Sequence, residues 1–255
     1  MTKANGLKNI MFMKMNDKRY KGAEAKPERH GGRAVAKIPK PKPINETEGY
    51  RIITDLFRRK DAKAIVKMGS SVDVLGMSPL ALAASVGHKD AVVCLLTAND
   101  NVNRQSPDGN YPLIQAVRGK FMEITELLLK KGALVTLQNY YGTTALHLAT
   151  EKKWEGCVEF LLLNGADVNS RNANGCTALF IAVVTGDLKL TEKLVAQGTD
   201  ILIEDNDGFS AICRGIEAEK EDIVKYLMTK LSNSQKEFYA KVGPKRQMFD
   251  KRRWK

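Results

Sequence analysis

NYYGTTALHLAT, residues 139–150, contains the glycine and the small-residue motif that decide the fold of this chain. Its glycine belongs to a series with a constant step of 33 residues: Gly76, Gly109, Gly142, Gly175 and Gly208. Five equally spaced glycines make a period, and a period of this length indicates stacked units of supersecondary structure.

Each glycine of the series precedes two helical patterns. The first begins with a small or polar residue, then Pro or Ala, then Leu or Ile: SPLA at 78–81, YPLI at 111–114, TALH at 144–147, TALF at 177–180 and SAIC at 210–213. The second has apolar residues at i, i+3 and i+4, as in Val158, Leu161 and Leu162, which predicts a helix with one buried face. Three second helices are followed by a glycine, where the chain needs a left-handed residue: Gly132, Gly165 and Gly198.

These units resemble ankyrin repeats. The family pattern of a turn glycine, T-P-L-H-x-A and a later L-L-x-x-G-A-x-V-N is met closely by GTTALHLAT at 142–150 and by LLLNGADVN at 161–169. The resemblance covers residues 47–231 and implies an all-α solenoid of stacked helix-turn-helix units with finger-like turns. The first unit is degenerate and the last contains the unusual SAICRGIEAEK, as expected of the two capping ends of a solenoid.

Composition divides the chain into three parts. Residues 1–46 form a basic, Pro/Gly-rich tail that we expect to be disordered, residues 47–231 the ankyrin-repeat domain, and residues 232–255 a basic C-terminal tail. The formal charge of +12 resides in the tails, because residues 1–45 carry +9, residues 46–231 carry −3 and residues 232–255 carry +6. Inside the domain, apolar spacing at 52–57 and 65–68 predicts a short helix pair before the periodic units.

The chain lacks an evident catalytic set. The resemblance places His147 where the family's histidine makes structural hydrogen bonds between neighbouring turns, and His88 at the start of a second helix. Nucleophilic catalysis needs a base, usually histidine, beside Ser or Cys. With both histidines in scaffold positions, we expect no enzyme activity, no catalytic residue and no cofactor.

The cysteines and the hydropathy indicate the cellular compartment in which we expect the protein. Four cysteines fall in or beside apolar helical patterns without metal-ligand spacing: Cys94, Cys157, Cys176 and Cys213. We therefore expect small buried thiols in a reducing compartment and no metal site. No stretch approaches the ~20 apolar residues that span a bilayer, so we expect a cytoplasmic and/or nuclear protein.

Members of the family bind other proteins on the concave side built from first helices and fingers. Carrying these positions over one at a time gives the protein-binding candidates Met77, Asn110, Tyr140, Tyr141, Thr143, Phe209, Arg118, Glu151 and Lys152. The two tyrosines are the sharpest candidates, since tyrosine is enriched among residues that carry most of an interface's energy. The alternative is that one ring folds back over the neighbouring turn. Trp154, where a second helix begins, is either a contact or a packing residue.

The C-terminal tail admits three interpretations. Its segment GPKRQMFDKRRWK, residues 243–255, holds the basic residues Lys245, Arg246, Lys251, Arg252 and Arg253. They form a short nuclear localisation signal read by an import receptor, a contact to nucleic acid or acidic lipid, or a solvated tail.

These observations together predict a monomeric, non-enzymatic adaptor that binds one or more partner proteins on the concave face and fingers of its repeats. The alternative is a nucleic-acid-associated or nuclear regulatory protein, whose basic tails bind polyanions while the repeats recruit partners.

Overall fold

The computed structural model describes residues 55, 78–98, 100–107 and 109–236. Within them the chain forms five consecutive helix pairs, numbered here as units 1 to 5: α4 (Pro79–Ser85) with α5 (Lys89–Thr97), α6 (Pro112–Arg118) with α7 (Met122–Lys130), α8 (Ala145–Glu151) with α9 (Glu155–Leu163), α10 (Ala178–Thr185) with α11 (Leu188–Ala196), and α12 (Ala211–Glu217) with α13 (Glu221–Thr229). A helical turn at 233–236 continues past the expected domain end at residue 231. The helix pair predicted at 52–57 and 65–68 lies outside the described residues, except for Asp55.

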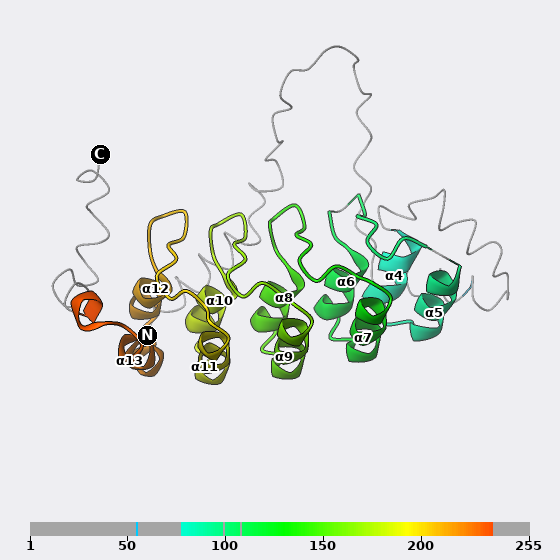
Figure 1. Cartoon of the computed structure of the whole chain (residues 1–255). Coiled ribbons are helices and arrows are strands. Elements are labelled where there is room, and N and C mark those ends of the chain that lie inside the picture. Colours follow the sequence, from blue (N-terminus) through cyan, green and yellow to red (C-terminus); the bar gives the residue numbers. More distant parts are fainter. Residues whose placement is uncertain (1–54, 56–77, 99, 108, 237–255) are drawn as a thin grey trace, which may run out of the picture.

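The helix pairs stack side by side in sequence order. In Figure 1 the first helices, α4 to α12 in even numbers, form one row and the second helices form another. Finger-like turns project from the row of first helices (Figure 1). Each first helix packs on its own second helix, and in units 1 to 4 it also packs on the first helix of the next unit. The all-α solenoid expected from the sequence is confirmed.

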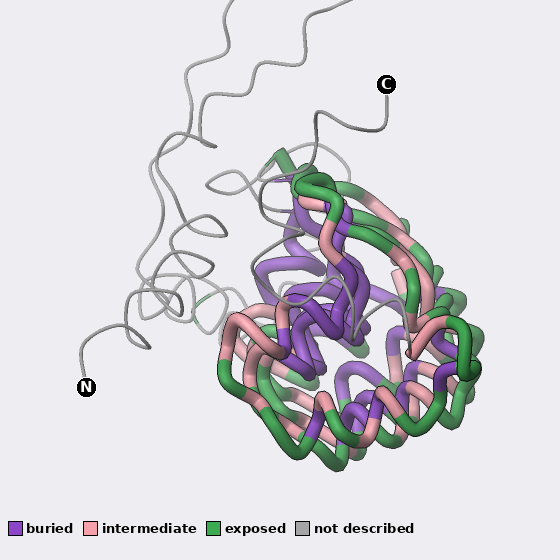
Figure 2. Tube along the Cα trace, turned by 90° about the vertical axis from the view of Figure 1, so that its left-hand side faces the viewer, coloured by how far each residue is buried: buried purple, intermediate pink, exposed green. Residues whose placement is uncertain are grey.

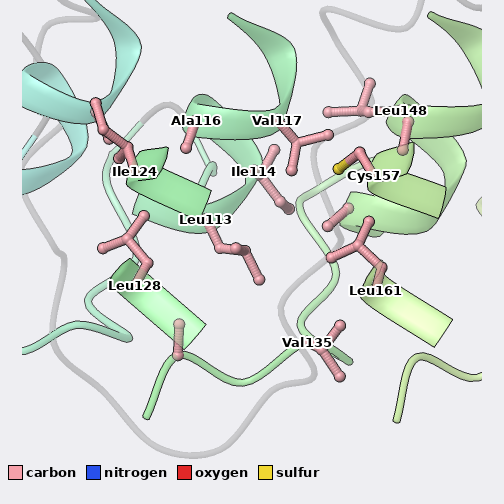
Figure 3. Packing of buried hydrophobic residues seen from close by; sticks show 14 of the residues in the cluster. Leu113, Ile114, Ala116, Val117, Ile124, Leu128, Val135, Leu148, Cys157 and Leu161 are labelled. Carbon is pink, nitrogen blue, oxygen red and sulfur yellow. The ribbon is translucent and has the colours of Figure 1, made fainter. Parts of the chain in front are cut away.

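Apolar side chains from neighbouring units share one core. Ile114 and Val117 of α6 lie between Leu128 of α7 and Leu161 of the following unit, and all four are at most 1% exposed (Figure 3). Burying a leucine or isoleucine side chain stabilises the fold by about 1.5–3 kcal/mol. The leucine position repeats in all five described units and is fully buried each time, as Leu95, Leu128, Leu161, Leu194 and Leu227. Every unit is therefore stabilised in large part by its neighbours.

Local sequence fixes where the helices begin and end. Ser78 and Ser210 cap α4 and α12, because each hydroxyl oxygen accepts a hydrogen bond from the amide three residues on. The second helices of units 2, 3 and 4 end before Gly132, Gly165 and Gly198, whose φ angles of 87°, 85° and 82° are left-handed, as the sequence predicts.

The turn between the two helices of each unit also contains a left-handed residue. Units 1 and 4 use glycine there, Gly87 and Gly186, with φ of 74° and 73°. Units 2, 3 and 5 place Lys120, Lys153 and Glu219 in the same conformation, with φ of 59°, 51° and 55°. A side chain makes this conformation unfavourable, so three of the five described turns keep a charged residue where glycine would be less strained.

Candidate protein-binding surface

A single polar side chain organises each of the last three fingers. In finger 3, residues 139–143, the side-chain oxygen of Asn139 accepts hydrogen bonds from the amides of Tyr141 at 2.9 Å and Thr143 at 3.0 Å. Asn172 in finger 4, residues 172–176, and Asp205 in finger 5, residues 205–209, accept the equivalent pairs of amides. Asn and Asp hold turns in this way because their short side chains reach the backbone two residues on.

Fingers 3, 4 and 5 are joined to one another through their backbones. The amide of Ala173 donates to the carbonyl oxygen of Tyr141 at 2.9 Å, and that of Asn206 donates to Asn174 at 3.0 Å. Gly142 permits the first of these approaches, because a Cβ there would lie 2.7 Å from the Ala173 nitrogen. The three fingers therefore form one preformed strip.

Tyr140 and Tyr141 stand at the tip of finger 3. Their side chains are among the exposed large hydrophobic ones, with 66% and 44% of the residue surface accessible. The Tyr140 ring lies against Gly109 of the preceding finger, where an added Cβ would come within 2.2 Å of a ring carbon. One side of this ring thus packs on the neighbouring turn, and the rest of it remains accessible.

The first helices expose side chains mainly at their C-terminal ends. All of residues 112–117 in α6 are buried, whereas Arg118 is exposed. In α8 the equivalent end has half-buried Glu151 and exposed Lys152. The accessible surface beside the fingers is therefore made of these helix ends.

Asn110 differs from the expectation of an exposed finger residue. It is 6% exposed, and its side-chain oxygen accepts from Nη2 of Arg118 and from Nδ2 of Asn139, both at 3.1 Å. Nη1 of Arg118 also donates to Oε1 of Gln115 at 3.2 Å. Asn110 is buried because it links two neighbouring units, and it holds the Arg118 guanidinium in place. Thr143, by contrast, keeps part of its surface open.

Phe209 in finger 5 is half-buried under an arginine. The Arg214 guanidinium lies 4.5 Å from the centre of the Phe209 ring and forms ion pairs with Asp205, Asp207 and Glu217. Burial alone would lower the pKa of Arg214, but the hydrogen bond and charge of Asp205, followed by those of Glu217, raise it. Arg214 thus stays charged and fixes the position of Phe209.

The histidines and cysteines have structural roles. His147 is 1% exposed; its Nδ1 accepts from the amide of Thr144 at 3.2 Å, so Nε2 carries the proton and donates to the carbonyl oxygen of Cys176 at 3.1 Å. Burial lowers the pKa of His147 and raises the pKa values of Cys157 and Cys176 to about 12. A buried neutral imidazole and protonated thiols suit a scaffold, as the sequence implied. His88 likewise caps α5 by accepting from the amide of Ala91.

The described residues show neither a cluster of metal ligands nor a helix that could span a membrane. No three His, Cys, Asp or Glu side chains among them gather as a metal site would require. None of the helices in this part of the chain is long and apolar enough to cross a membrane.

Comparison with known proteins identifies the repeats. A family model of ankyrin repeats, three copies long, matches residues 80–172 and again residues 152–237. The chain belongs to the ankyrin repeat family. The ankyrin repeats of this chain make a protein-binding domain, and the comparison names no partner.

Two curated relatives share part of the ankyrin array. The B-cell lymphoma 3 protein homolog of Mus musculus is 36% identical over 76 residues, which are 29% of this chain and 17% of the relative. BCL-6 corepressor-like protein 1 of Homo sapiens is 34% identical over 102 residues, 40% of this chain and 6% of the relative. The chain therefore spans less than a fifth of either relative.

The remaining candidates divide between packing positions and undescribed parts of the chain. Trp154 is half-buried at the N-cap of α9 and packs against the ankyrin core. Met77 and the basic residues Lys245, Arg246, Lys251, Arg252 and Arg253 lie outside the described residues.

The Arg214 cluster was not predicted from the sequence. Arg214 occupies the position of Leu82, Leu148 and Ile181 in three other ankyrin units, and Asp205 occupies that of Asn139 and Asn172. A charged residue at a mostly apolar position, together with an acid at a position that is Asn in the two preceding units, was the signal that could have revealed this ion pair.

Proposed function

We propose that this ankyrin array is a non-enzymatic adaptor that binds partner proteins on the face formed by fingers 3 to 5 and the ends of α6 and α8. Tyr140 and Tyr141 form its centre, and the surrounding contacts come from Thr143, Phe209, Arg118, Glu151 and Lys152. The observation that carries the proposal is the accessible tyrosine pair on a finger that is bonded to its neighbour. Tyrosine offers a large contact area with few rotatable bonds.

The links between fingers favour binding energetically. Ordering loops and side chains at an interface normally costs free energy that is subtracted from affinity. Here Asn139 fixes the turn, the Ala173 amide fixes the finger, and Gly109 supports one face of the Tyr140 ring. A partner would therefore meet a surface whose backbone is already in place.

Affinity capture tests this proposal. The full chain is used as bait in nuclease-treated lysate, beside the double variant Tyr140→Ala/Tyr141→Ala, and bound proteins are identified by mass spectrometry. The matched control is Leu134→Ala/Leu163→Ala, since these leucines are 54% and 86% exposed but follow or end second helices. We expect the control to retain a specific set of proteins that the tyrosine variant loses. Retention of the same set by both variants would contradict the proposed surface.

The second candidate function is nuclear regulation with polyanion binding by the tails. It is supported by the +9 and +6 charges of the terminal segments and by the name of one relative, which describes a corepressor-like protein. Under this proposal the protein is cytoplasmic and/or nuclear, and capture depends on the tails. Binding through tails would fall steeply with added salt and with nuclease treatment, whereas apolar contacts at the fingers would not.

A further inference from the structure

Cationic side chains gather at two neighbouring turns of the array. Arg118 ends α6 and Lys120 lies in the turn between α6 and α7, while Lys152 and Lys153 lie in the turn between α8 and α9; we call these four residues the basic turns. Helix α6 packs directly on α8, so the two turns are adjacent. Nζ of Lys153 donates to the carbonyl oxygen of Thr185 in the following unit at 3.1 Å, which shows that one side chain reaches from turn to turn.

Several lysines on the second helices form ion pairs, which the lysines of the basic turns do not. Lys89 pairs with Glu123 at 2.7 Å, and Lys189 with Glu155 at 2.8 Å, each across two units. Lys120 and Lys152 are exposed, and their side chains have no hydrogen bond or ion pair to any described residue. Arg118 is held by Gln115 and Asn110, two neutral acceptors that leave its charge uncompensated.

Two of these cations have a backbone conformation that glycine adopts with less strain. Lys120 and Lys153 adopt the left-handed conformation that Gly87 and Gly186 adopt in other units. Lys153 gains a hydrogen bond to Thr185, whereas the Lys120 side chain has no hydrogen bond or ion pair within the described chain. A strained residue that folding does not require points to a role in binding.

We propose that the basic turns bind a short acidic segment of a partner protein through its Asp and Glu carboxylates. This inference rests on the proposed function and names the chemistry of the partner. Arginine and lysine bind carboxylates through charge-assisted hydrogen bonds, and such complementary charge also speeds encounter.

The charge along the row of turns favours a protein segment over a nucleic acid. Beyond unit 3 the excess of positive charge ends, because Asp187 caps α11 and Glu219 stands beside Lys220 in unit 5. A nucleic acid carries a phosphate at every nucleotide and would need cations along its whole path. A short acidic stretch needs them only at the two basic turns.

Fluorescence anisotropy with a short fluorescein-labelled peptide rich in glutamate tests the assignment. The variant Lys120→Gly/Lys152→Ala removes two charges from the basic turns, and the control Lys130→Ala/Lys131→Ala removes two exposed charges at the end of α7. At low salt we expect the first variant to bind the probe at least about tenfold more weakly and the control less than about twofold. Glycine at position 120 should not lower the melting temperature, so a loss of binding would not reflect unfolding.

Three outcomes would overturn the inference. Equal weakening by both variants would assign the attraction to net charge, and equal binding of a glutamine-for-glutamate peptide would exclude carboxylate recognition. Tighter binding of single-stranded oligodeoxythymidylate, with the same dependence on the basic turns, would assign the site to nucleic acid. The proposed function is tested separately: a captured partner that is lost with Tyr140→Ala/Tyr141→Ala yet retained by the turn variant would uphold the adaptor and contradict only the acidic segment.

Discussion

At the scale of single residues, Thr144 and Thr177 occupy the same position of adjacent units but differ in their partners. The Thr144 hydroxyl lies 2.8 Å from Nδ1 of His147. Phe180 replaces this histidine in unit 4, and the buried Thr177 hydroxyl has no partner among the described residues. We predict that Thr144→Val lowers the free energy of unfolding by about 1–3 kcal/mol, while Thr177→Val changes it by less than about 0.5 kcal/mol or raises it. Urea titration measures both, and equal losses would refute the prediction.

His147 should make stability depend on pH. Burial lowers its pKa in the folded protein, so the fold favours the neutral imidazole. As the pH falls below the ordinary value of about 6.5, the unfolded chain gains a proton first, and stability is lost at up to about 1.4 kcal/mol per pH unit. We predict that the wild type loses more stability between about pH 7.5 and about pH 5.5 than His147→Gln does. Parallel pH dependences of the two proteins would contradict this role.

At the scale of elements, close packing of the fingers leaves no room for a side chain at Gly142. Gly142 and Gly165 both have left-handed φ angles, 66° and 85°, but only Gly142 faces another backbone. Gly165→Ala should cost the strain of a side chain in that conformation, about 1–2 kcal/mol. Gly142→Ala should cost about 1–3 kcal/mol more, because its Cβ would collide with Ala173. Chemical denaturation of the two variants compares them, and a larger loss at position 165 would argue against joined fingers.

Removing Arg214 alone should destabilise the fold more than replacing both Arg214 and its partner Asp205. Asp205 has a side chain only 3% exposed and accepts from Arg214 Nε at 2.7 Å. Arg214→Leu, the residue that units 1 and 3 have there, would leave this carboxylate buried without its cation, at a cost of about 3 kcal/mol. Adding Asp205→Asn, the residue of fingers 3 and 4, should recover most of this loss. Hydrogen exchange of α12 and α13 would locate the effect, and no recovery in the double variant would contradict it.

At the scale of the whole molecule, the period of 33 residues predicted the architecture correctly. Every unit folds into the same helix pair and buries its apolar face against its neighbours in the same way. The left-handed glycines after the second helices also followed from local pattern, and the scaffold role of His147 followed from the resemblance to ankyrin repeats. The pairing of Asn110 with Asn139 of the next unit did not. The sequence left open whether one tyrosine ring folds back over the neighbouring turn, and the Tyr140 ring does so at Gly109. Burial of Asn110 in particular arises from contacts between units, which no single repeat encodes.

The array also distributes its surface unevenly. Most residues of the first helices are buried by packing. Figure 2 shows buried residues on the inside of the array and exposed residues along its outer turns. What remains beside the fingers is the tyrosine pair and the cationic helix ends. Partner choice should therefore depend on few side chains, each held by backbone or by a neighbouring unit.

The most direct test of the account is the dissociation constant of a purified captured partner for the wild type, for Tyr140→Ala/Tyr141→Ala and for Leu134→Ala/Leu163→Ala. We predict that the tyrosine variant loses about 1–4 kcal/mol of binding free energy, while the leucine variant loses less than about 0.5 kcal/mol. Unchanged affinity in the tyrosine variant would show that the partner binds elsewhere and would contradict the proposed face of the array.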